Sequence, residues 1–181
     1  MFETDGFIEA CRIALAQDAG GSRAVRALLG RTVADPGQVM AGLGEPQRAG
    51  ITTLHRADDL TILNVVWGPG MTIMPHNHRM WAVIGVYTGG EDNIYWRRLP
   101  DGRLEAAGAQ AVRARDCAVL GKDIVHSVTN PLLKLTGAIH IYGGDFFAAD
   151  RSEWDPETLT EGRYDVEKAK RLFEASNRIA G

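Results

Sequence analysis

Two histidines one residue apart, His76 and His78, are the clearest sign of chemistry in this sequence. In a β-strand successive side chains point to opposite faces, so positions i and i+2 share a face. The pair can therefore direct two imidazoles at one point, as metal coordination requires. Pro75 directly precedes the pair, and a Gly-Pro-Gly turn lies at 68–70. We interpret this stretch as the start of a strand that carries two metal ligands.

The elements around this pair are predicted to be mostly strands, with helices at both ends of the chain. Apolar runs bounded by turn signals predict further strands over 51–56, 60–67, 81–87, 92–99, 104–114, 117–120, 124–128 and 132–142. Helical periodicity predicts helices over 6–18, from Ser22, after Pro36 and after Asp165. Eight or more short strands at regular spacing indicate an all-β barrel or jelly roll.

The chain length suggests one domain with small additions at each end. We expect an N-terminal helical segment over 1–50, packed on a barrel that covers 51–147. The remainder, 148–181, is expected to form a C-terminal tail and a last helix, with loops over 145–164 leading into that helix. The acidic pair Glu91 and Asp92 is predicted to lie in a solvated turn.

The composition is ordinary for a globular protein and excludes several classes of function. The 181 residues carry a net charge of −3, so nothing favours binding to nucleic acid or to an anionic membrane. No apolar run approaches the roughly 20 residues that span a bilayer, and the acidic start at 1–5 is unlike a signal peptide. We expect a cytoplasmic monomer or small homo-oligomer with no nucleic-acid or membrane partner.

A third histidine can complete the ligand set. His126 follows a Gly-Lys-Asp turn and lies on a later predicted strand. In a double-stranded β-helix that strand faces the His-x-His strand inside the barrel, so His126 can join His76 and His78. Imidazole suits iron, zinc, copper and nickel alike, so these residues do not choose the metal.

The stretches 68–90 and 121–126 resemble the two sequence motifs of the cupin superfamily. The first motif normally places a glutamate ligand about four residues after its second histidine. Here Ala82 and Val83 occupy those positions, and no acid appears before Glu91. The resemblance implies a cupin double-stranded β-helix with three histidine ligands and no carboxylate. Such a site leaves a divalent metal its full positive charge, which suits an anionic thiolate substrate.

Within the cupins, the chain from Thr52 to the last helix resembles the thiol dioxygenases. These are cysteine dioxygenase and, more closely, the bacterial 3-mercaptopropionate dioxygenases. The most specific likeness covers 138–145 and 151–156. The family places a Ser-x-His-x-Tyr stretch beside its iron; this chain keeps His140 and Tyr142 but has Ala138 in place of the serine.

Two arginines match positions where the thiol dioxygenases bind the substrate carboxylate. Arg151 matches the arginine of the 3-mercaptopropionate branch, and Arg56 lies near the arginine of the cysteine branch. The resemblance implies Fe(II) as the cofactor, a small thiol carboxylate and O2 as substrates, and a sulfinic acid as the product. It also implies that Tyr142 donates a hydrogen bond near the reacting sulfur and that His140 sets the orientation of Tyr142.

Two other functions share the same barrel and stay open at this point. One is a three-histidine cupin dioxygenase that cleaves a carbon–carbon bond, for example in a β-diketone. The other is a non-catalytic cupin that binds a metal or a small ligand.

Overall fold

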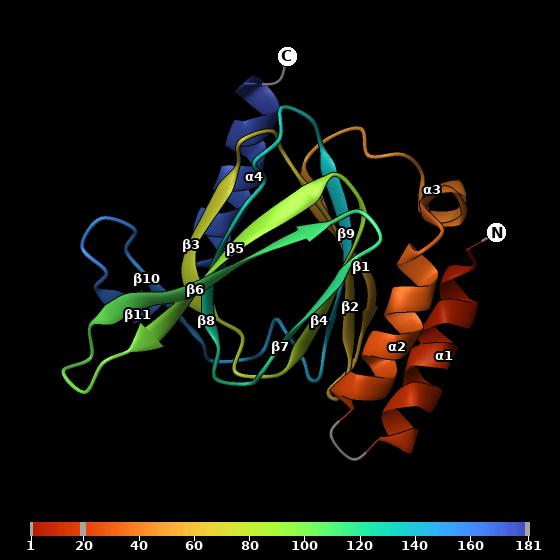
Figure 1. Cartoon of the computed structure of the whole chain (residues 1–181), viewed down its shortest axis with the longest axis horizontal. Helices are drawn as coiled ribbons and strands as arrows, with labels where there is room; N and C mark the ends of the chain where they lie inside the picture. The colour runs from red at the N-terminus through yellow and green to blue at the C-terminus, as the bar shows by residue number, and fades with distance from the viewer. Residues whose placement is uncertain (1, 19–20, 180–181) are drawn as a thin grey trace.

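Two antiparallel sheets face each other in the computed structural model, which describes residues 2–18 and 21–179 (Figure 1). The first sheet contains, in spatial order, β1 (Gly50–Arg56), β2 (Thr61–Trp67), β9 (Thr136–Tyr142), β4 (Ala82–Thr88) and β7 (Cys117–Leu120). The second contains β11 (Glu161–Arg163), β10 (Ser152–Trp154), β3 (Thr72–Asn77), β8 (Val125–Thr129), β5 (Gly90–Arg98) and β6 (Leu104–Arg113). The order β2-β9-β4-β7 facing β3-β8-β5-β6 is that of a jelly roll. The predicted double-stranded β-helix is therefore confirmed.

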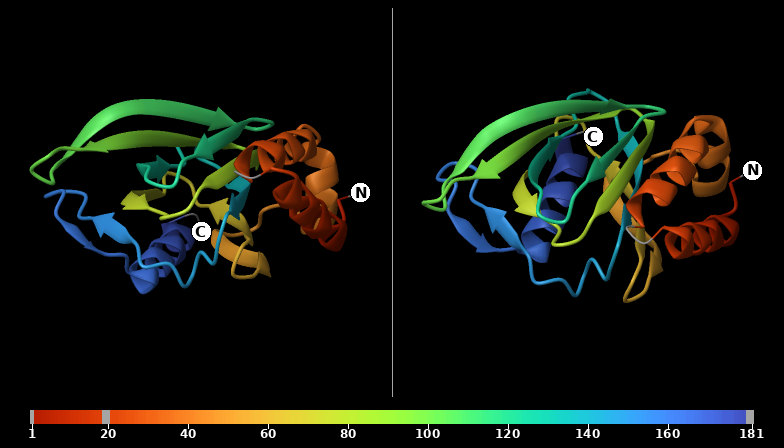
Figure 2. Two further views of the ribbon diagram at one scale, coloured as in Figure 1. Left: turned by 90° about the horizontal axis from the view of Figure 1, so that it is seen from below. Right: turned by 60° about the horizontal axis from the view of Figure 1, so that its bottom comes forward.

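Four helices flank the sheets on two sides. Helices α1 (Thr4–Gln17), α2 (Ser22–Val33) and α3 (Pro36–Leu43) precede the strands and lie against the outer face of the first sheet (Figures 1 and 2). Helix α4 (Val166–Ile179) contacts β1 and β3, which belong to different sheets, and so covers one opening of the barrel. None of the helices in the described part of the chain has the length and apolar character needed to cross a membrane.

Strands β2 and β9 bury both of their faces, which explains their nearly continuous apolar sequences. Alternate residues such as Ile62, Ile139 and Ile141 pack against the N-terminal helices. Their neighbours in sequence, including Leu63 and Ala138, point into the barrel. Because side chains alternate along a strand, one apolar run supplies two separate cores.

Helix α2 approaches β4 closely at a glycine. A Cβ atom added at Gly85 would lie 2.7 Å from Cγ of Leu29 and 3.0 Å from a methyl group of Val33. Real Cβ atoms do not pack at the shorter of these distances. Glycine at this position therefore sets how near the helix lies to the sheet.

Several segments differ from the prediction. The His-x-His pair was predicted at the start of a strand, but His76 lies near the end of β3 and His78 follows that strand. Strand β9 begins at Thr136, not at Leu132. The tail over 145–164, predicted to be loops, contains the short strands β10 and β11. Strand β10 pairs with β3, and Glu153 lies opposite His76. Strands of three residues show too little alternation to be recognised locally, and their partners are distant in sequence.

Candidate metal centre

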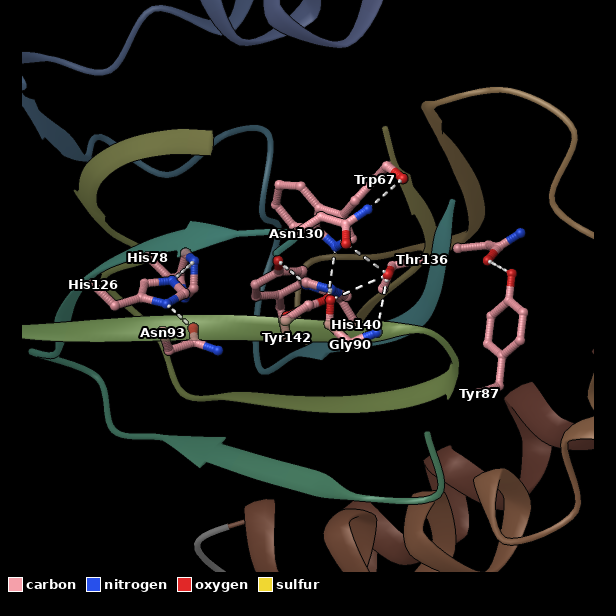
Figure 3. Close-up of polar contacts among 12 residues, drawn as sticks. Trp67, His78, Tyr87, Gly90, Asn93, His126, Asn130, Thr136, His140 and Tyr142 are labelled. Atoms are coloured by element: carbon pink, nitrogen blue, oxygen red, sulfur yellow. Dashed lines mark hydrogen bonds and ion pairs between the residues drawn. The ribbon is translucent and has the colours of Figure 1, made fainter. Parts of the chain in front are cut away.

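Neighbouring strands of the second sheet place the three histidines together. The strand of His126 was expected to face the His-x-His strand across the barrel, but β8 lies beside β3 in the same sheet. In the β3–β8 pair the Cα atom of His76 lies opposite that of His126, and His78 follows directly after the end of β3. The pairing of β3 shifts register between Ile73 and His76, a stretch that contains Pro75, which has no N–H to donate to the ladder. The three imidazoles are buried and gather on one side of the barrel, as Figure 3 shows for His78 and His126.

The distances between the imidazole nitrogens fit one shared metal ion. His78 Nε2 lies 3.2 Å from His76 Nε2 and 3.2 Å from His126 Nε2. All three ligand atoms lie within 4.8 Å of one another. Two nitrogens 3.2 Å apart that each bind one ion at about 2.0–2.1 Å subtend an angle of about 100° at that ion. This angle lies between the ideal octahedral and tetrahedral values.

Hydrogen bonds on the far side of the rings leave the inward nitrogens free to bind a metal. His76 Nδ1 donates to the carbonyl oxygen of Met74 at 2.9 Å, and His126 Nδ1 donates to Asn93 Oδ1 at 2.8 Å. A neutral imidazole that donates through Nδ1 carries its lone pair on Nε2. Asn93 was not predicted as a site residue; it is buried on β5 two positions after Glu91, so the two share the inward face of that strand.

Burial also favours the uncharged imidazoles that metal binding requires. It lowers the pKa of His76 to about 4 and the pKa values of His78 and His126 well below their usual range. Among the described residues, the group that could hold a metal contains these three histidines and no carboxylate. This is the ligand set that was predicted.

His140 and Tyr142 reach the same region from the opposite sheet. Both lie on the inward face of β9, and His140 Nδ1 is 3.1 Å from the Tyr142 hydroxyl oxygen. The Tyr142 ring centroid is 5.0 Å from that of His78, and Figure 3 places the two residues next to the histidine group. Burial raises the pKa of Tyr142, so its phenol keeps its proton. Ala138, two positions before His140, is fully buried and offers no hydroxyl.

The prediction that Glu91 lies in a solvated turn is wrong. Strand β5 begins at Gly90, two residues earlier than predicted, and Glu91 is 0% exposed inside the barrel. Its Oε1 atom accepts a hydrogen bond of 2.6 Å from Trp67 Nε1 and lies 3.3 Å from His140 Nε2. Asp92 points the other way and pairs with Arg113 at 2.7 Å. Had the strand been predicted to begin at Gly90, alternation would have placed Glu91 on its inward face. The misplaced strand boundary therefore caused the error.

Arg151 is a buried cation without an anionic partner. It is only 5% exposed, and its guanidinium lies 3.8 Å from the ring centroid of Phe146 and 4.0 Å from that of Tyr164. Within the described part of the chain, its Nη1 atom has no hydrogen-bond partner and no carboxylate forms an ion pair with it. Burial lowers the pKa of Arg151, but an arginine remains charged in proteins. A buried, unpaired guanidinium is suited to binding an anion.

Two adjoining cavities connect Arg151 with the histidines. The inner cavity, of about 40 Å³, is lined by the three histidines, His140 and Tyr142. The outer cavity, of about 590 Å³, lies between β1 and α4 and includes Arg151 in its wall. Both cavities share four lining residues, Ile51, Phe146, Tyr164 and Phe173. A molecule whose anionic end is held by Arg151 would therefore lie next to the inner cavity.

The structure does not bring Arg56 together with the histidines. Its guanidinium binds both carboxylate oxygens of Asp145 at 2.8 to 3.1 Å and lies 5.1 Å from the ring centroid of Phe147. Arg56 is exposed at the end of β1 and lines neither cavity. Contact between Arg56 and a substrate stays a prediction, and within the chain this charge already has a carboxylate partner.

Several solved structures are similar to parts of this chain at low sequence identity. No model of a known protein family matches the chain. A cupin family protein of RmlC type from Methanocaldococcus jannaschii superposes with a TM-score of 0.48 at 8% identity, over 57% of this chain and 86% of its own. The DMSP lyase DddQ from Ruegeria pomeroyi gives 0.48 at 16% identity, over 61% of this chain and 53% of its own. A protein from Klebsiella pneumoniae with a double-stranded β-helix domain gives 0.45 at 13% identity, over 67% of this chain and 90% of its own.

Proposed function

We propose that the protein is an iron-dependent thiol dioxygenase acting on a small thiol carboxylate, either 3-mercaptopropionate or cysteine. One molecule of O2 adds both of its oxygen atoms to the substrate sulfur, which gives a sulfinic acid. The sulfur loses four electrons and O2 gains four, so no further reductant is needed. The observation that supports this proposal most is the unpaired, buried Arg151 beside a three-histidine group that lacks a carboxylate.

His76, His78 and His126 would hold Fe(II) through their Nε2 atoms. Imidazole binds several metals, and the need to react with O2 selects Fe(II) in this proposal. The bound iron would supply the one-electron chemistry that lets O2 react with a thiolate. Because all three protein ligands are neutral, a substrate thiolate would not meet a second negative charge in the ligand set.

Arg151 would fix the substrate carboxylate. Its guanidinium is held between two aromatic rings, so its orientation is already set before a substrate binds. The free Nη1 atom can donate to a carboxylate oxygen, and such charge-assisted bonds are stronger than neutral ones. A carboxylate held there directs the remainder of the molecule toward the inner cavity, so Arg151 would control binding more than the chemical step.

Tyr142 would hold a proton next to the reacting atoms. Its hydroxyl is buried within hydrogen-bond distance of His140, and the Phe146 ring packs 4.2 Å from the Tyr142 ring. These aromatic walls exclude water from the region, which strengthens the hydrogen bonds made there. Positioning and local electrostatics are thus the protein's contribution to the reaction.

Oxygen consumption and sulfinate formation in the iron-loaded protein test the proposal. We expect turnover with 3-mercaptopropionate or cysteine and little with 2-mercaptoethylamine, which lacks a carboxylate. Arg151→Gln should raise KM for the carboxylate substrate by about 100-fold, because the lost charge-assisted pair is worth roughly 3 kcal/mol. The control Arg103→Gln removes an exposed arginine whose partner is Asp101 and should change nothing. Absence of sulfinate from both thiols would refute the proposed function.

The outer cavity favours a second candidate. Its volume of about 590 Å³ exceeds what 3-mercaptopropionate needs, and apolar residues such as Ile51, Val66, Phe147 and Phe173 form much of its wall. A three-histidine dioxygenase that cleaves a larger non-thiol substrate, such as a β-diketone, would use this space. Turnover of a β-diketone that survives Arg151→Gln would favour this candidate over the thiol dioxygenase.

A further inference from the structure

Glu91 links the two sheets across the interior of the barrel. Its carboxylate comes from β5 in the second sheet, and both of its partners come from the first sheet, Trp67 on β2 and His140 on β9. Glu91 is 0% exposed, and His140 is the only basic side chain that the described residues bring within ion-pair distance of its carboxylate. Arg113 donates to the backbone carbonyl of Glu91 and not to its carboxylate.

The identity of the partners fixes where the hydrogens lie. An indole nitrogen can only donate, so Trp67 Nε1 donates to Glu91 Oε1 at 2.6 Å. His140 Nε2 lies 3.3 Å from the same oxygen. With an ionised carboxylate this contact is favourable only when Nε2 carries the hydrogen and donates to Glu91, because otherwise two acceptors would face each other.

The other nitrogen of His140 then faces the candidate site. Nδ1 lies 3.1 Å from the hydroxyl oxygen of Tyr142, whose ring packs against His78. Ala138 lies on β9 with His140 and pairs with a residue of β2. It is buried but has no hydroxyl that could orient the His140 ring. The only side-chain partner that the described residues offer to His140 Nε2 is therefore Glu91.

A purely structural carboxylate would be expected to use both oxygens. Glu91 Oε2 is buried and finds no hydrogen-bond partner among residues 2–18 and 21–179, although burial of a polar atom without a partner is unfavourable. The chain keeps a carboxyl side chain where an apolar one of similar size would fill the space among Trp67, Val112 and their neighbours. This arrangement indicates a function for the carboxyl group besides packing.

We propose that Glu91 is a positioning residue that holds His140 with Nε2–H toward the carboxylate and Nδ1 toward the Tyr142 hydroxyl. Glu91 thereby determines the direction in which the Tyr142 oxygen presents its hydrogen and its lone pairs to the inner cavity. The hydrogen-bond arrangement stands on the geometry alone, whereas its effect on turnover rests on the proposed function.

The protonation pattern of the His140 ring tests the proposal without any turnover. In the metal-free, uniformly ¹⁵N-labelled protein, long-range ¹H–¹⁵N correlation should show Nε2 of His140 protonated. Glu91→Met removes the acceptor, and the ring should lose this fixed Nε2–H form. Glu91→Gln retains an acceptor oxygen, so His140 should keep the Nε2–H form in part. This second variant is available if Glu91→Met does not fold. An unprotonated Nε2 in the wild type, or an unchanged Nε2–H pattern in folded Glu91→Met, would overturn the proposal.

The indole proton of Trp67 gives a second readout of the same contact. The Trp67 Nε1–H resonance, identified by its loss in Trp67→Phe, should lie downfield in the wild type and move upfield in Glu91→Met. The matched control Glu105→Gln changes an exposed carboxylate that pairs with Arg97 and should move neither the Trp67 nor the His140 signals.

Kinetics connect the arrangement to the site. Glu91→Gln and Glu91→Met should lower kcat by about 10- to 100-fold with KM nearly unchanged, as is typical when a group behind an active-site residue is lost. Equal kcat in folded, iron-loaded variants would overturn the catalytic role of Glu91. If the wild type oxidises no thiol, the proposed function fails, while the His140 pattern still decides the position of its hydrogen.

Discussion

The Cα atoms of His76 and His126 lie opposite each other in the antiparallel pair formed by β3 and β8, although 49 positions separate them in the chain. Side chains directly opposite on neighbouring strands project from the same face. This pairing brings the third imidazole to the two that the His-x-His spacing already places together. The register of β3 against β8 therefore assembles the candidate metal centre.

Asn93→Ala should weaken metal binding by about 10- to 100-fold, because Asn93 Oδ1 holds the Nδ1–H of His126 and so directs its Nε2 at the metal. Competition between the protein and a coloured chelator measures the affinity. The matched control is Asn64→Ala, which removes an amide oxygen that accepts from Tyr87 and not from a candidate ligand. Equal affinities in the two variants would show that Asn93 does not orient His126.

Metal binding should stabilise the native chain. A metal that binds only the folded protein adds about 2.7 kcal/mol when its free concentration is 100 times Kd, and for a domain of this size each 1 kcal/mol raises Tm by about 2–4 °C. Thermal unfolding with iron under anaerobic conditions, with zinc and with chelator measures the effect. His126→Ala should abolish the metal-dependent shift, and a shift retained in that variant would place the metal elsewhere.

The metal-free protein should lose stability as the pH falls from about 6.5 toward 4. Burial lowers the pKa of His76 to about 4 and the pKa values of His78 and His126 well below the 6.5 of an ordinary histidine. In this interval the unfolded chain binds more protons than the folded chain, so the free energy of unfolding decreases with decreasing pH. Each histidine contributes up to about 1.4 kcal/mol per pH unit.

Urea denaturation in the presence of chelator measures this pH dependence. A variant with His126→Gln has one titrating imidazole fewer in the barrel, so its stability should depend less steeply on pH. A wild-type free energy of unfolding that stays constant over this interval would contradict the burial of neutral imidazoles.

Gly85→Ala should destabilise the protein by about 1–3 kcal/mol, because its Cβ would meet Leu29 on α2 at 2.7 Å. Gly108→Ala on β6 is the control, since a Cβ there meets nothing within 4 Å. Chemical denaturation measures both variants. Adding Leu29→Ala to Gly85→Ala should cost less than the two single changes summed, and simple additivity would show that the two residues do not compete for space.

Local patterns in the sequence are sufficient to predict the strands of the barrel and part of the candidate site. Alternating apolar positions and turn residues located most strands to within two residues, because each strand's burial is encoded in consecutive side chains. The same alternation placed His76 with His78 and His140 with Tyr142 on shared faces. The third ligand, His126, required the expected jelly-roll topology in addition.

Tertiary structure decided the partners of the charged residues. Glu91 and Asp92 are adjacent acids, yet one crosses the barrel to Trp67 and His140 and the other remains at the surface. Arg56 is bound by Asp145, whereas Arg151 lies between two rings without a carboxylate.

The sequence by itself thus determined which faces of the strands are apolar and which imidazoles share a face, since these follow from neighbouring positions. Only the folded chain determined strand β10 beside His76, the burial of Glu91 and the pairing of each guanidinium. Those features depend on contacts between residues far apart in the chain, where the register of distant strands decides which polar groups meet.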